Sequence, residues 1–318
     1  YSRDRLGLAA WLTDENNPLT ARVAINRYWQ MVFGRGLVRT SEDFGIQGEL
    51  PTHPALLDWL SAEFVDSGWD LRHMLKIMVM SSTYRQSSYT SFEIMEQDPA
   101  NTFYARSPSY RWPAEFIRDN FLAASGLLVK EIGGEPVKPY QPEGLWKELG
   151  GASNKLVKYE HDTLDALYRR SIYSFQRRFM PHPFMSNFDA SSREICQVRR
   201  DMTNSPLQAL TLMNDPQVIE ASRILSERVL KASEDTSEQI ELGYRLATGV
   251  TPTDRQVELL KAQFTEALKH FEQHQNEADS LLSIGEKPYD ASLEKNRVAA
   301  MAMVANTIFN YDDSYTKR

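Results

Sequence analysis

Arginine is the residue type in this sequence that most strongly suggests binding chemistry. It is concentrated in two stretches of a chain whose formal net charge is -7. A guanidinium group donates paired hydrogen bonds to carboxylate and phosphate groups in a fixed planar geometry. Each stretch could therefore bind an anionic ligand, or could pair internally with acidic side chains and hold loops in place.

The first stretch is the N-terminal block from residue 17 to residue 88, where arginines and carboxylates alternate around Gly34 and Gly36. Its candidate binding residues are Asn26, Arg27, Arg35, Asp43 and His53, and Arg39 and Glu42 lie in the same block. An internal ion-pair network would explain this composition without a ligand, and we favour it. His53 and His73 lie near expected helix starts, so we expect them to form structural hydrogen bonds.

The second stretch runs from residue 168 to residue 215 and alternates arginines with aromatic side chains. Its arginines are Arg169, Arg170, Arg177, Arg178, Arg193, Arg199 and Arg200. The candidate binding residues in this stretch are Arg193, Arg199, Arg200, Gln208 and Asn214. A sulfated or carboxylated sugar could be held by paired guanidinium groups beside aromatic rings. The alternative is that these arginines pair with nearby carboxylates and tie an irregular centre to the helices.

These candidates suggest a simple structural criterion. If Arg27, Arg35, Asp43, His53, Arg193, Arg199 and Asn214 converge on one open pocket, a binding site is favoured; if they pair internally, a scaffold is favoured.

Signatures of known cofactor and catalytic chemistry are absent from the sequence. It lacks the dinucleotide, phosphate-loop, haem-attachment, zinc-protease and serine-hydrolase motifs. His270 and His274 could share a metal ion, but their acidic, glutamine-rich surroundings favour a solvated helix face. Cys196 lies among arginines that would lower a thiol pKa, yet no partner base is evident, so we favour a buried structural thiol. We predict no metal site and no cofactor within this chain.

Composition limits the class of protein. The 318 residues are 42% hydrophobic and 25% charged, which is typical of globular domains. The acidic balance argues against a general nucleic-acid binder. No segment approaches the roughly 20 apolar residues of a membrane span. One cysteine excludes a disulfide within the chain. Because the sequence begins at Tyr1 without a signal-like segment, we interpret it as a mature form or a fragment.

Apolar periodicity and capping residues predict a mainly α fold. The first helix follows Asn17-Pro18 and ends at Gly34, and the next begins at Pro54 and ends at Gly68. Asp70 is expected to cap a third helix. Further helices are predicted over residues 113–128, 207–213 and 216–231, and along apolar stripes at 257–271 and 298–309.

The centre of the chain lacks a sustained period. Residues 131–162 read as a long loop of a kind that is often functional. Residues 170–179 could form a strand or a buried helix, and we favour the strand. The predicted fold is therefore an irregular helical domain with a long loop-rich centre and, optionally, a short β-hairpin. We expect one module over residues 1–318, with N-terminal helices (1–128), a loop-rich centre (129–203) and C-terminal helices (204–318).

A dense series of motifs resembles a known family. The N-terminal ones have the form Asn-Pro-x-x-Ala-Arg, Asn-Arg-x-Trp, Phe-Gly-Arg-Gly, Asp-Phe-Gly, His-Pro, Leu-Leu-Asp-Trp-Leu and Tyr-Arg-Gln-Ser. They lie at residues 17–22, 26–29, 33–36, 43–45, 53–54, 56–60 and 84–87; later matches are 139–146, Cys196, Arg199, Arg200, Thr203, Pro206, 208–210, Asn214 and Asp215. Together they resemble a C-terminal domain of unknown function from planctomycete-type proteins with c-type cytochrome modules.

The resemblance implies a context rather than a reaction. Such domains usually follow another domain of unknown function in exported bacterial proteins, so it implies a periplasmic or otherwise exported location. Haem c is implied only in an adjacent module, and no catalytic residue is carried over. We favour a non-catalytic interaction or scaffold module that docks an upstream domain of the same polypeptide. The alternative is part of an active or binding site for an anionic carbohydrate, with an anionic polysaccharide as partner.

Overall fold

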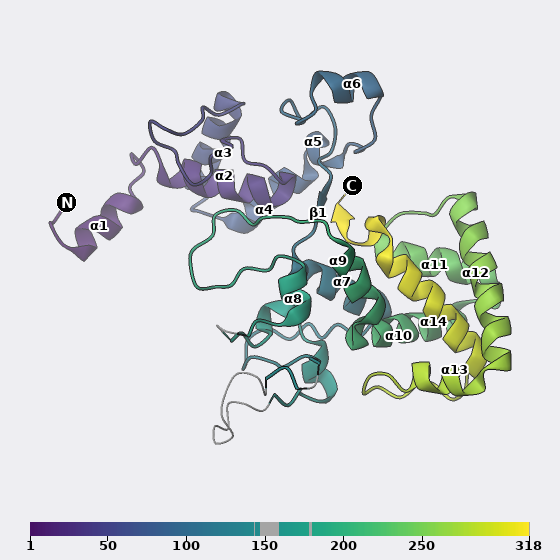
Figure 1. Cartoon of the computed structure of the whole chain (residues 1–318). Helices are drawn as coiled ribbons and strands as arrows, with labels where there is room; N and C mark the ends of the chain where they lie inside the picture. Colours follow the sequence, from purple (N-terminus) through teal and green to yellow (C-terminus); the bar gives the residue numbers. More distant parts are fainter. Residues whose placement is uncertain (143, 147–158, 178–179, 318) are drawn as a thin grey trace. The chain divides into compact units, whose positions relative to one another are not determined.

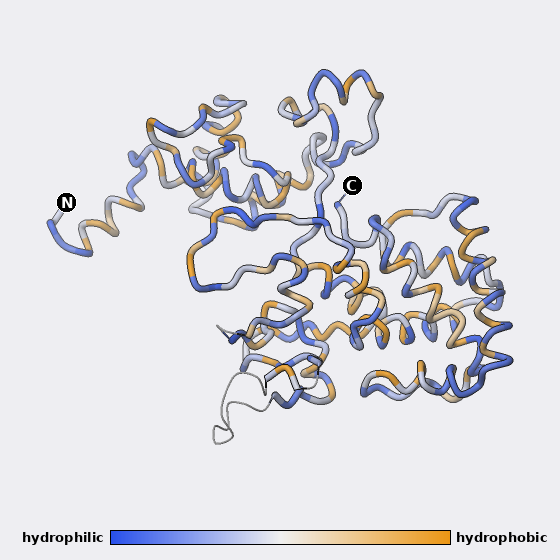
Figure 2. Tube along the Cα trace, viewed as in Figure 1, coloured by the Kyte–Doolittle hydropathy of each residue, from blue (hydrophilic) through white to orange (hydrophobic). Residues whose placement is uncertain are grey.

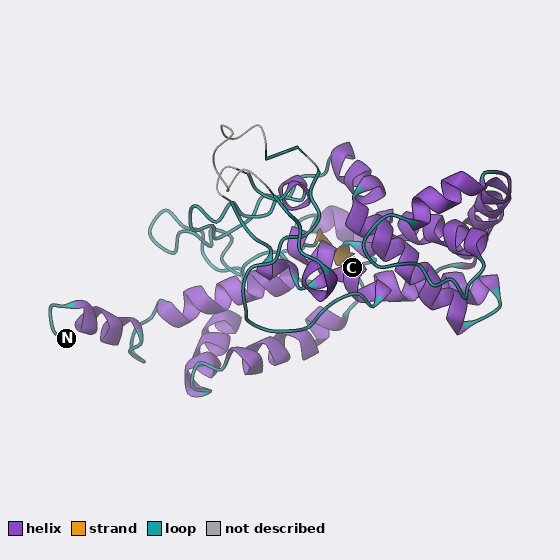
Figure 3. Ribbon diagram, turned by 90° about the horizontal axis from the view of Figure 1, so that it is seen from below, coloured by secondary structure: helices purple, strands orange, loops and turns teal. Residues whose placement is uncertain are grey.

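The protein is mainly α-helical, as the sequence predicts (Figures 1 and 3). The structure, a computed structural model, describes residues 1–142, 144–146, 159–177 and 180–317. Among these residues, one two-stranded antiparallel sheet joins β1 (Tyr110–Arg111) with β2 (Thr316–Lys317), so its strands come from distant parts of the sequence.

The chain forms two compact units. Unit 1 contains residues 1–110 and 196–199 together with Lys317, and unit 2 contains the described parts of residues 111–195 and 200–316. That the two units act together as the single module expected from the sequence stays a prediction.

Unit 1 is built around α2, α3 and α4, which match the helices expected from the sequence. Gly34 ends α2 in a left-handed conformation with a φ of 76°. The side chain of Asp70 accepts hydrogen bonds from the backbone of Arg72 and His73 at the start of α4. Ile25, Trp29 and Phe33 of α2 are buried in the core. The helices of unit 1 are α1 (Arg5–Leu12), α2 (Thr20–Phe33), α3 (Pro54–Asp66), α4 (Leu71–Met80), α5 (Ser82–Arg85) and α6 (Phe92–Gln97).

Unit 2 centres on the packing of α10 against α14. The α14 residues Ala299, Ala300 and Ala302 are buried, and their small side chains allow close helix packing. Figure 2 shows hydrophilic residues interrupted by hydrophobic ones along α12, in agreement with the predicted amphipathic stripe. The helices of unit 2 are α7 (Ala114–Ser125), η3 (Leu164–Tyr168), η4 (Ser171–Tyr173), α8 (Pro183–Asn187), α9 (Pro206–Asn214), α10 (Pro216–Ala232), α11 (Thr236–Thr248), α12 (Asp254–Gln273), α13 (Gln275–Leu282), α14 (Lys295–Asn310) and η5 (Asp312–Ser314).

A buried arginine connects several of these elements. Arg118 of α7 is 1% exposed and donates from all three guanidinium nitrogens. Its acceptors are Gln217 Oε1 at 2.7 Å, the carbonyl of Arg169 at 2.9 Å, Ser171 Oγ at 3.1 Å and the carbonyl of Leu167 at 2.7 Å. Burial lowers the pKa of Arg118 to about 10, so the group stays charged at neutral pH. Arg118 therefore holds the irregular segment 167–171 against α7 and α10.

One helix boundary and one secondary-structure type differ from the sequence predictions. The α7 helix ends at Ser125 because Gly126 adopts a left-handed conformation with a φ of 89°, whereas the sequence suggested an end near residue 128. The strand expected over 170–179 is wrong for its described residues, which contain the 3₁₀ helix η4 and an isolated bridge between Val137 and Ser174. Arg178 and Phe179 lie outside the described residues.

None of the described helices combines the length and the apolar character needed to cross a lipid bilayer.

Candidate anion-binding site

A small cavity in unit 1 is surrounded by arginine side chains. Its volume is about 140 Å³, and it is lined by Gln30, Gly34, Arg35, Gly36, Arg39 and Arg199. Half of these residues are cationic and none is acidic, so the cavity presents hydrogen-bond donors to whatever enters it. Arg199 comes from the segment 196–199, far from the other residues in sequence.

Two glycines shape the turn that positions Arg35. A side chain at Gly34 would place its Cβ 2.7 Å from the ring of Tyr110, and its φ of 76° strains other residues. A Cβ at Gly36 would lie 2.5 Å from the carbonyl oxygen of Val38 and 2.6 Å from Asn26 Nδ2. Only glycine fits at both places, so the chain turns tightly after α2 with Arg35 between the two glycines.

Asn26 fastens the loop that follows this turn. Its buried side chain donates to the carbonyl of Val38 at 3.0 Å and to Ser41 Oγ at 3.1 Å, and it accepts from the Val38 backbone at 2.8 Å. Asn26 is therefore a positioning residue of the loop rather than a group that faces a ligand.

Gln30, one turn further along α2, connects the loop to the distant segment that carries Arg199. Its Oε1 accepts a hydrogen bond from Ser41 Oγ, and its Nε2 lies 3.4 Å from the carbonyl oxygen of Val198. This contact holds residues 196–199 beside α2 and explains why Arg199 reaches the same cavity as Arg35. The i, i+4 spacing from Asn26 could have marked Gln30 as part of the site, but the partner segment is distant in sequence.

The arginines of the cavity are poorly compensated by acidic groups. Among the described residues, Arg35 and Arg199 have no carboxylate partner, and Arg39 has only Glu49, with Nε and Oε2 3.6 Å apart on an exposed surface. Arg35 Nη1 is buried without a hydrogen-bond partner. A buried donor left unsatisfied costs about 1–3 kcal/mol, so an anion in the cavity would recover part of that cost.

A tyrosine from a later part of unit 1 caps part of the C-terminal end of α2. Two carbonyls in the last turn of α2, those of Met31 and Val32, accept hydrogen bonds from the hydroxyl of Tyr110 at 3.0 and 3.1 Å. Burial raises the pKa of Tyr110 to about 12, so its hydroxyl keeps the proton that it donates. The arginines of the cavity are therefore not needed as donors to these two carbonyls.

The other N-terminal candidates do not line this cavity. Arg27 is exposed on α2, Asp43 accepts from the backbone of Gly45 at 2.7 Å, and His53 Nδ1 lies 3.0 Å from Thr52 Oγ1. Glu42 and Asp43 contact no arginine within the described part of the chain. The ion-pair network favoured from the sequence is therefore not formed among these residues.

In the second stretch, three of the seven arginines have protein partners inside unit 2 in the described part of the chain, namely Arg169, Arg177 and Arg200. Arg200 donates to both carboxylate oxygens of Glu115, at 2.6 and 3.1 Å. Arg169 donates to backbone carbonyls and lies 4.3 Å from the ring centre of Tyr173, and Arg177 lies 4.6 Å from that of Trp146. Of these contacts, only that of Arg200 is with a carboxylate, so among these contacts the pairing of this stretch with nearby carboxylates is seen for Arg200.

The remaining candidates of unit 2 have individual environments. Arg193 is exposed and has a φ of 59°, whereas Gln208 is buried and donates to the carbonyl of Asn187 at 2.9 Å. Asn214 donates to the carbonyl of Leu210 at 2.8 Å and lines a separate cleft of unit 2. Of the ten candidates, Arg35 and Arg199 thus share one cavity of unit 1, and the convergence of all of them stays a prediction.

Cys196 and the histidine pair have surface positions. Cys196 is exposed, so the prediction of a buried thiol is wrong; the segment around it runs along the surface. His270 and His274 stack with ring centres 4.3 Å apart, and His270 Nε2 lies 2.7 Å from Glu277 Oε2. The described residues contain no cluster of three or more potential metal ligands.

Comparison with known proteins gives one family. The family model PSD1, described as "Protein of unknown function (DUF1553)", matches residues 4–264, which is most of the chain. No curated protein and no solved structure matches the sequence.

Proposed function

The chain belongs to the PSD1 family of proteins of unknown function, and we propose that its unit 1 is a binding module for an anionic group. The observation that carries this proposal is the cavity in which Arg35, Arg39 and Arg199 meet without an acidic neighbour among the lining residues. Such a module binds through charge-assisted hydrogen bonds, and its affinity falls as salt screens the exposed arginines.

An anionic carbohydrate is the ligand class that we propose. A sulfate or uronic carboxylate would accept from Arg35 and Arg199, and ring hydroxyls would exchange hydrogen bonds with Gln30 and with the backbone near Gly36. The small volume of about 140 Å³ suits one anionic substituent rather than a whole oligosaccharide. The rest of the sugar would lie across the surface around the cavity.

The cellular context of the proposal comes from the sequence motifs. We propose that the protein is periplasmic or otherwise exported, and that a c-type cytochrome module, if haem is involved, lies in an adjacent part of the polypeptide. The cavity itself supports binding without any cofactor in this chain, because its arginines supply the charge and the donors.

A thermal-shift screen tests the proposal. Sulfated and uronic oligosaccharides are added to the wild-type chain and to the Arg35→Gln and Arg199→Gln variants. A ligand that binds only the folded state raises the melting temperature. We expect a shift for the wild type and a strongly reduced shift for both variants.

The matched control is Arg27→Gln, which removes an exposed arginine of α2 that does not line the cavity. It should keep the full shift. The proposal is refuted if no anionic sugar shifts the wild-type transition, or if Arg27→Gln weakens binding as much as the cavity variants do.

A second role is favoured by α1, which exposes an apolar surface. Leu6, Leu8 and Trp11 are 78%, 56% and 45% exposed. Clustered exposed apolar residues often mark protein contacts. We propose that α1 docks an upstream domain of the same polypeptide, as the scaffold hypothesis requires. Pull-down of that separately produced domain should succeed with the wild type and fail with Leu8→Ser/Trp11→Ser; equal capture by both would contradict the role of α1.

A further inference from the structure

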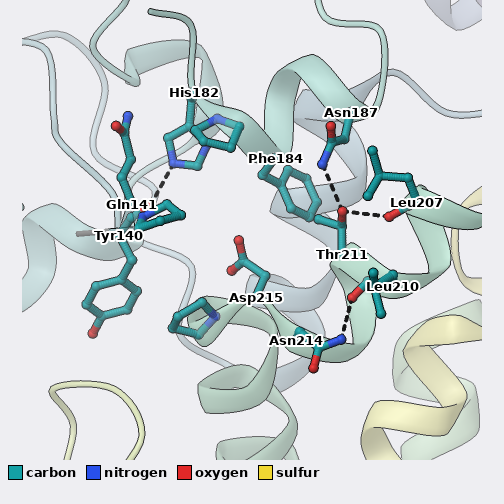
Figure 4. Close-up of a pocket in the computed structure, with 13 residues that line it drawn as sticks. Tyr140, Gln141, His182, Phe184, Asn187, Leu207, Leu210, Thr211, Asn214 and Asp215 are labelled. Atoms are coloured by element: carbon teal, nitrogen blue, oxygen red, sulfur yellow. Dashed lines mark hydrogen bonds between the residues drawn. The ribbon is translucent and has the colours of Figure 1, made fainter. Parts of the chain in front are cut away.

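A larger cleft lies entirely in unit 2. It has a volume of about 260 Å³ and is formed by the loop at 140–142, by α8 with His182 before it, by α9, and by the start of α10 (Figure 4). None of its titratable residues was among the candidates from the sequence. Its polar groups are of a different kind from those of the arginine cavity.

Asp215 provides a carboxylate at one end of the cleft. It precedes α10 and accepts a hydrogen bond from the backbone of Gln217 at 2.9 Å. Figure 4 shows its carboxylate pointing into the space between Tyr140 and Thr211. Burial raises the pKa of Asp215 to about 6, against the opposing effect of its backbone hydrogen bonds and of Arg118. The carboxylate is therefore ionised at neutral pH, although its environment is unfavourable for a charge.

His182 provides a second acceptor. The residue is 4% exposed, and its Nε2 lies 2.9 Å from the carbonyl oxygen of Tyr140. A carbonyl can only accept, so Nε2 carries the proton and Nδ1 carries the lone pair. Burial, with the charge of Arg118, lowers the pKa of His182 to about 4, so the ring is neutral. Its Nδ1 is buried without a hydrogen-bond partner.

The donors on the opposite wall are already engaged within the protein. Asn187 Nδ2 donates to Thr211 Oγ1 at 2.9 Å, and that hydroxyl donates to the carbonyl of Leu207 at 2.7 Å. Asn214 Nδ2 donates to the carbonyl of Leu210 at 2.8 Å. Figure 4 shows these bonds on the α9 side and the amide of Gln141 pointing away from Asp215. Apart from the helix-cap hydrogen bond that Asp215 accepts from the Gln217 backbone, the cleft therefore offers no free donor to His182 Nδ1 or to the Asp215 carboxylate.

The remaining walls are apolar. Phe184, Leu207 and Leu210 line the cleft together with prolines 142, 183 and 216. A ligand must therefore combine an apolar body with a group that donates hydrogen bonds.

We propose that the cleft of unit 2 binds a small primary amine in its protonated form, with the ammonium group donating to Asp215 and to Nδ1 of His182 and the apolar body against Phe184 and the leucines of α9. An ammonium group carries three donors and no acceptor, so it matches two acceptors and opposes the carboxylate charge. An anion is repelled by Asp215, and the donors on the opposite wall already bond to the protein. This site is independent of the arginine cavity and its proposed function.

The charged surroundings of Asp215 allow a cation. Arg118 of α7 is fixed by its hydrogen bonds and has the carboxylate of Asp119 3.9 Å from its Nη1. Tyr140 is neutral because burial raises its pKa, and its hydroxyl is bonded to Glu220. The lining residues from α9 carry no titratable group. Across the pH range in which Asp215 ionises, it is thus the group in this cleft whose charge changes.

Calorimetric titration of the full chain with n-butylammonium tests the proposal, with n-butanol and butyrate as probes of similar shape. We expect saturable binding of the amine at about pH 7.5 and roughly tenfold weaker binding at about pH 5, where most of Asp215 is protonated. Neither the alcohol nor the carboxylate should match the amine. The ¹⁵N signal of His182 Nδ1 should shift on binding of the amine.

Asp215→Asn removes the charge but retains a residue type suited to the helix start. It should lose at least tenfold in amine affinity. Asp235→Asn is the matched control, because Asp235 caps α11 in the same way at an exposed position. The proposal is overturned if n-butanol binds as tightly as the amine, if Asp215→Asn binds like Asp235→Asn, or if the wild type shows no saturable binding. The pH profile of the wild type decides the matter even if a variant fails to fold.

Discussion

An arginine of unit 2 and an arginine of unit 1 differ in whether the protein supplies acceptors for their guanidinium nitrogens. In unit 2, Arg118 is buried and each of its guanidinium nitrogens donates to a protein acceptor. In unit 1, Arg35 lines a cavity and has a buried Nη1 without a hydrogen-bond partner. Arg111 and Arg223 of unit 2 also have an unpartnered Nε, but each contacts a carboxylate through another nitrogen. A binding site is therefore indicated by arginines that border a cavity without carboxylates, rather than by arginine density.

Two consecutive residues show the difference at close range. Arg199 lines the cavity of unit 1 without an ion pair among the described residues, whereas Arg200 belongs to unit 2 and forms two hydrogen bonds with Glu115. Glu115 has a lowered pKa although burial opposes it, because Arg200 and other donors stabilise its charge. Sequence proximity thus says little about the role of an individual arginine.

The largest expected effect concerns Arg118. Arg118→Leu removes the donor to Gln217 Oε1 and to the carbonyl of Arg169, and leaves the carbonyl of Leu167 with only Gln217 Nε2, so the free energy of unfolding of unit 2 should fall by about 3–5 kcal/mol. Urea unfolding followed by hydrogen exchange in α7 and α10 measures this change. The control Arg170→Leu removes an exposed arginine and should change stability by no more than about 0.5 kcal/mol. A loss below about 1 kcal/mol for Arg118→Leu would contradict its structural role.

The next effect is a pH dependence from Asp215. Its pKa is raised from 3.8 to about 6 in the folded chain, so the folded state binds this proton more tightly than the unfolded state. The resulting stability is fully present below about pH 4 and is lost as pH rises through about 6, by at most about 3 kcal/mol. Asp215→Asn should therefore lose less stability than the wild type between about pH 4.5 and pH 7.5.

Asp235→Asn is the control for this pH dependence. The hydrogen bond from the Glu238 backbone, opposed by some desolvation, lowers the pKa of Asp235, so this carboxylate stabilises the fold above its unfolded pKa. Asp235→Asn should therefore lower stability at neutral pH, whereas Asp215→Asn should avoid the loss of stability that the wild type shows as pH rises. Denaturant unfolding at a series of pH values measures both, and parallel pH profiles for wild type and Asp215→Asn would contradict the buried-carboxylate explanation.

The smallest effect on stability is expected at Arg199. Because it is exposed and has no ion pair in the described part of the chain, Arg199→Gln should change the free energy of unfolding by less than about 0.5 kcal/mol. Arg200→Gln loses a two-bond contact with Glu115 and should cost about 1 kcal/mol. Thermal and urea unfolding of both variants distinguishes them, and equal losses would remove the contrast between the two arginines.

Local chemistry was enough to predict much of the fold. Gly34, Asp70 and the Asp215-Pro216 pair set helix ends or starts through φ preference and capping, which depend on neighbouring residues alone. The mainly α class followed from the apolar stripes. The end of α7 was misplaced because the sequence offers two glycine signals, at Gly126 and at 133–134, and the helix ends at the first of them.

The sites were harder to predict, because their determinants are tertiary. Arg35 was identified from its place between two glycines, but its cavity needs the contact between Gln30 and Val198, which are 168 residues apart in sequence. His182 gave no sequence signal, since its unpartnered Nδ1 arises from burial and from the carbonyl of Tyr140. Likewise, the sequence showed Asp215 as a helix cap, and its raised pKa depends on the protein that surrounds it.

The most direct test of the arginine cavity is an NMR titration of arginine Nε–Hε signals with a uronic disaccharide. We predict saturable shifts for Arg35 and Arg199, and none for Arg118, whose donors are already engaged. Arg35→Gln should abolish the shift at Arg199. If the signals of Arg35 and Arg199 stay unchanged up to the solubility limit of the sugar, the proposal that unit 1 is an anion-binding module is contradicted.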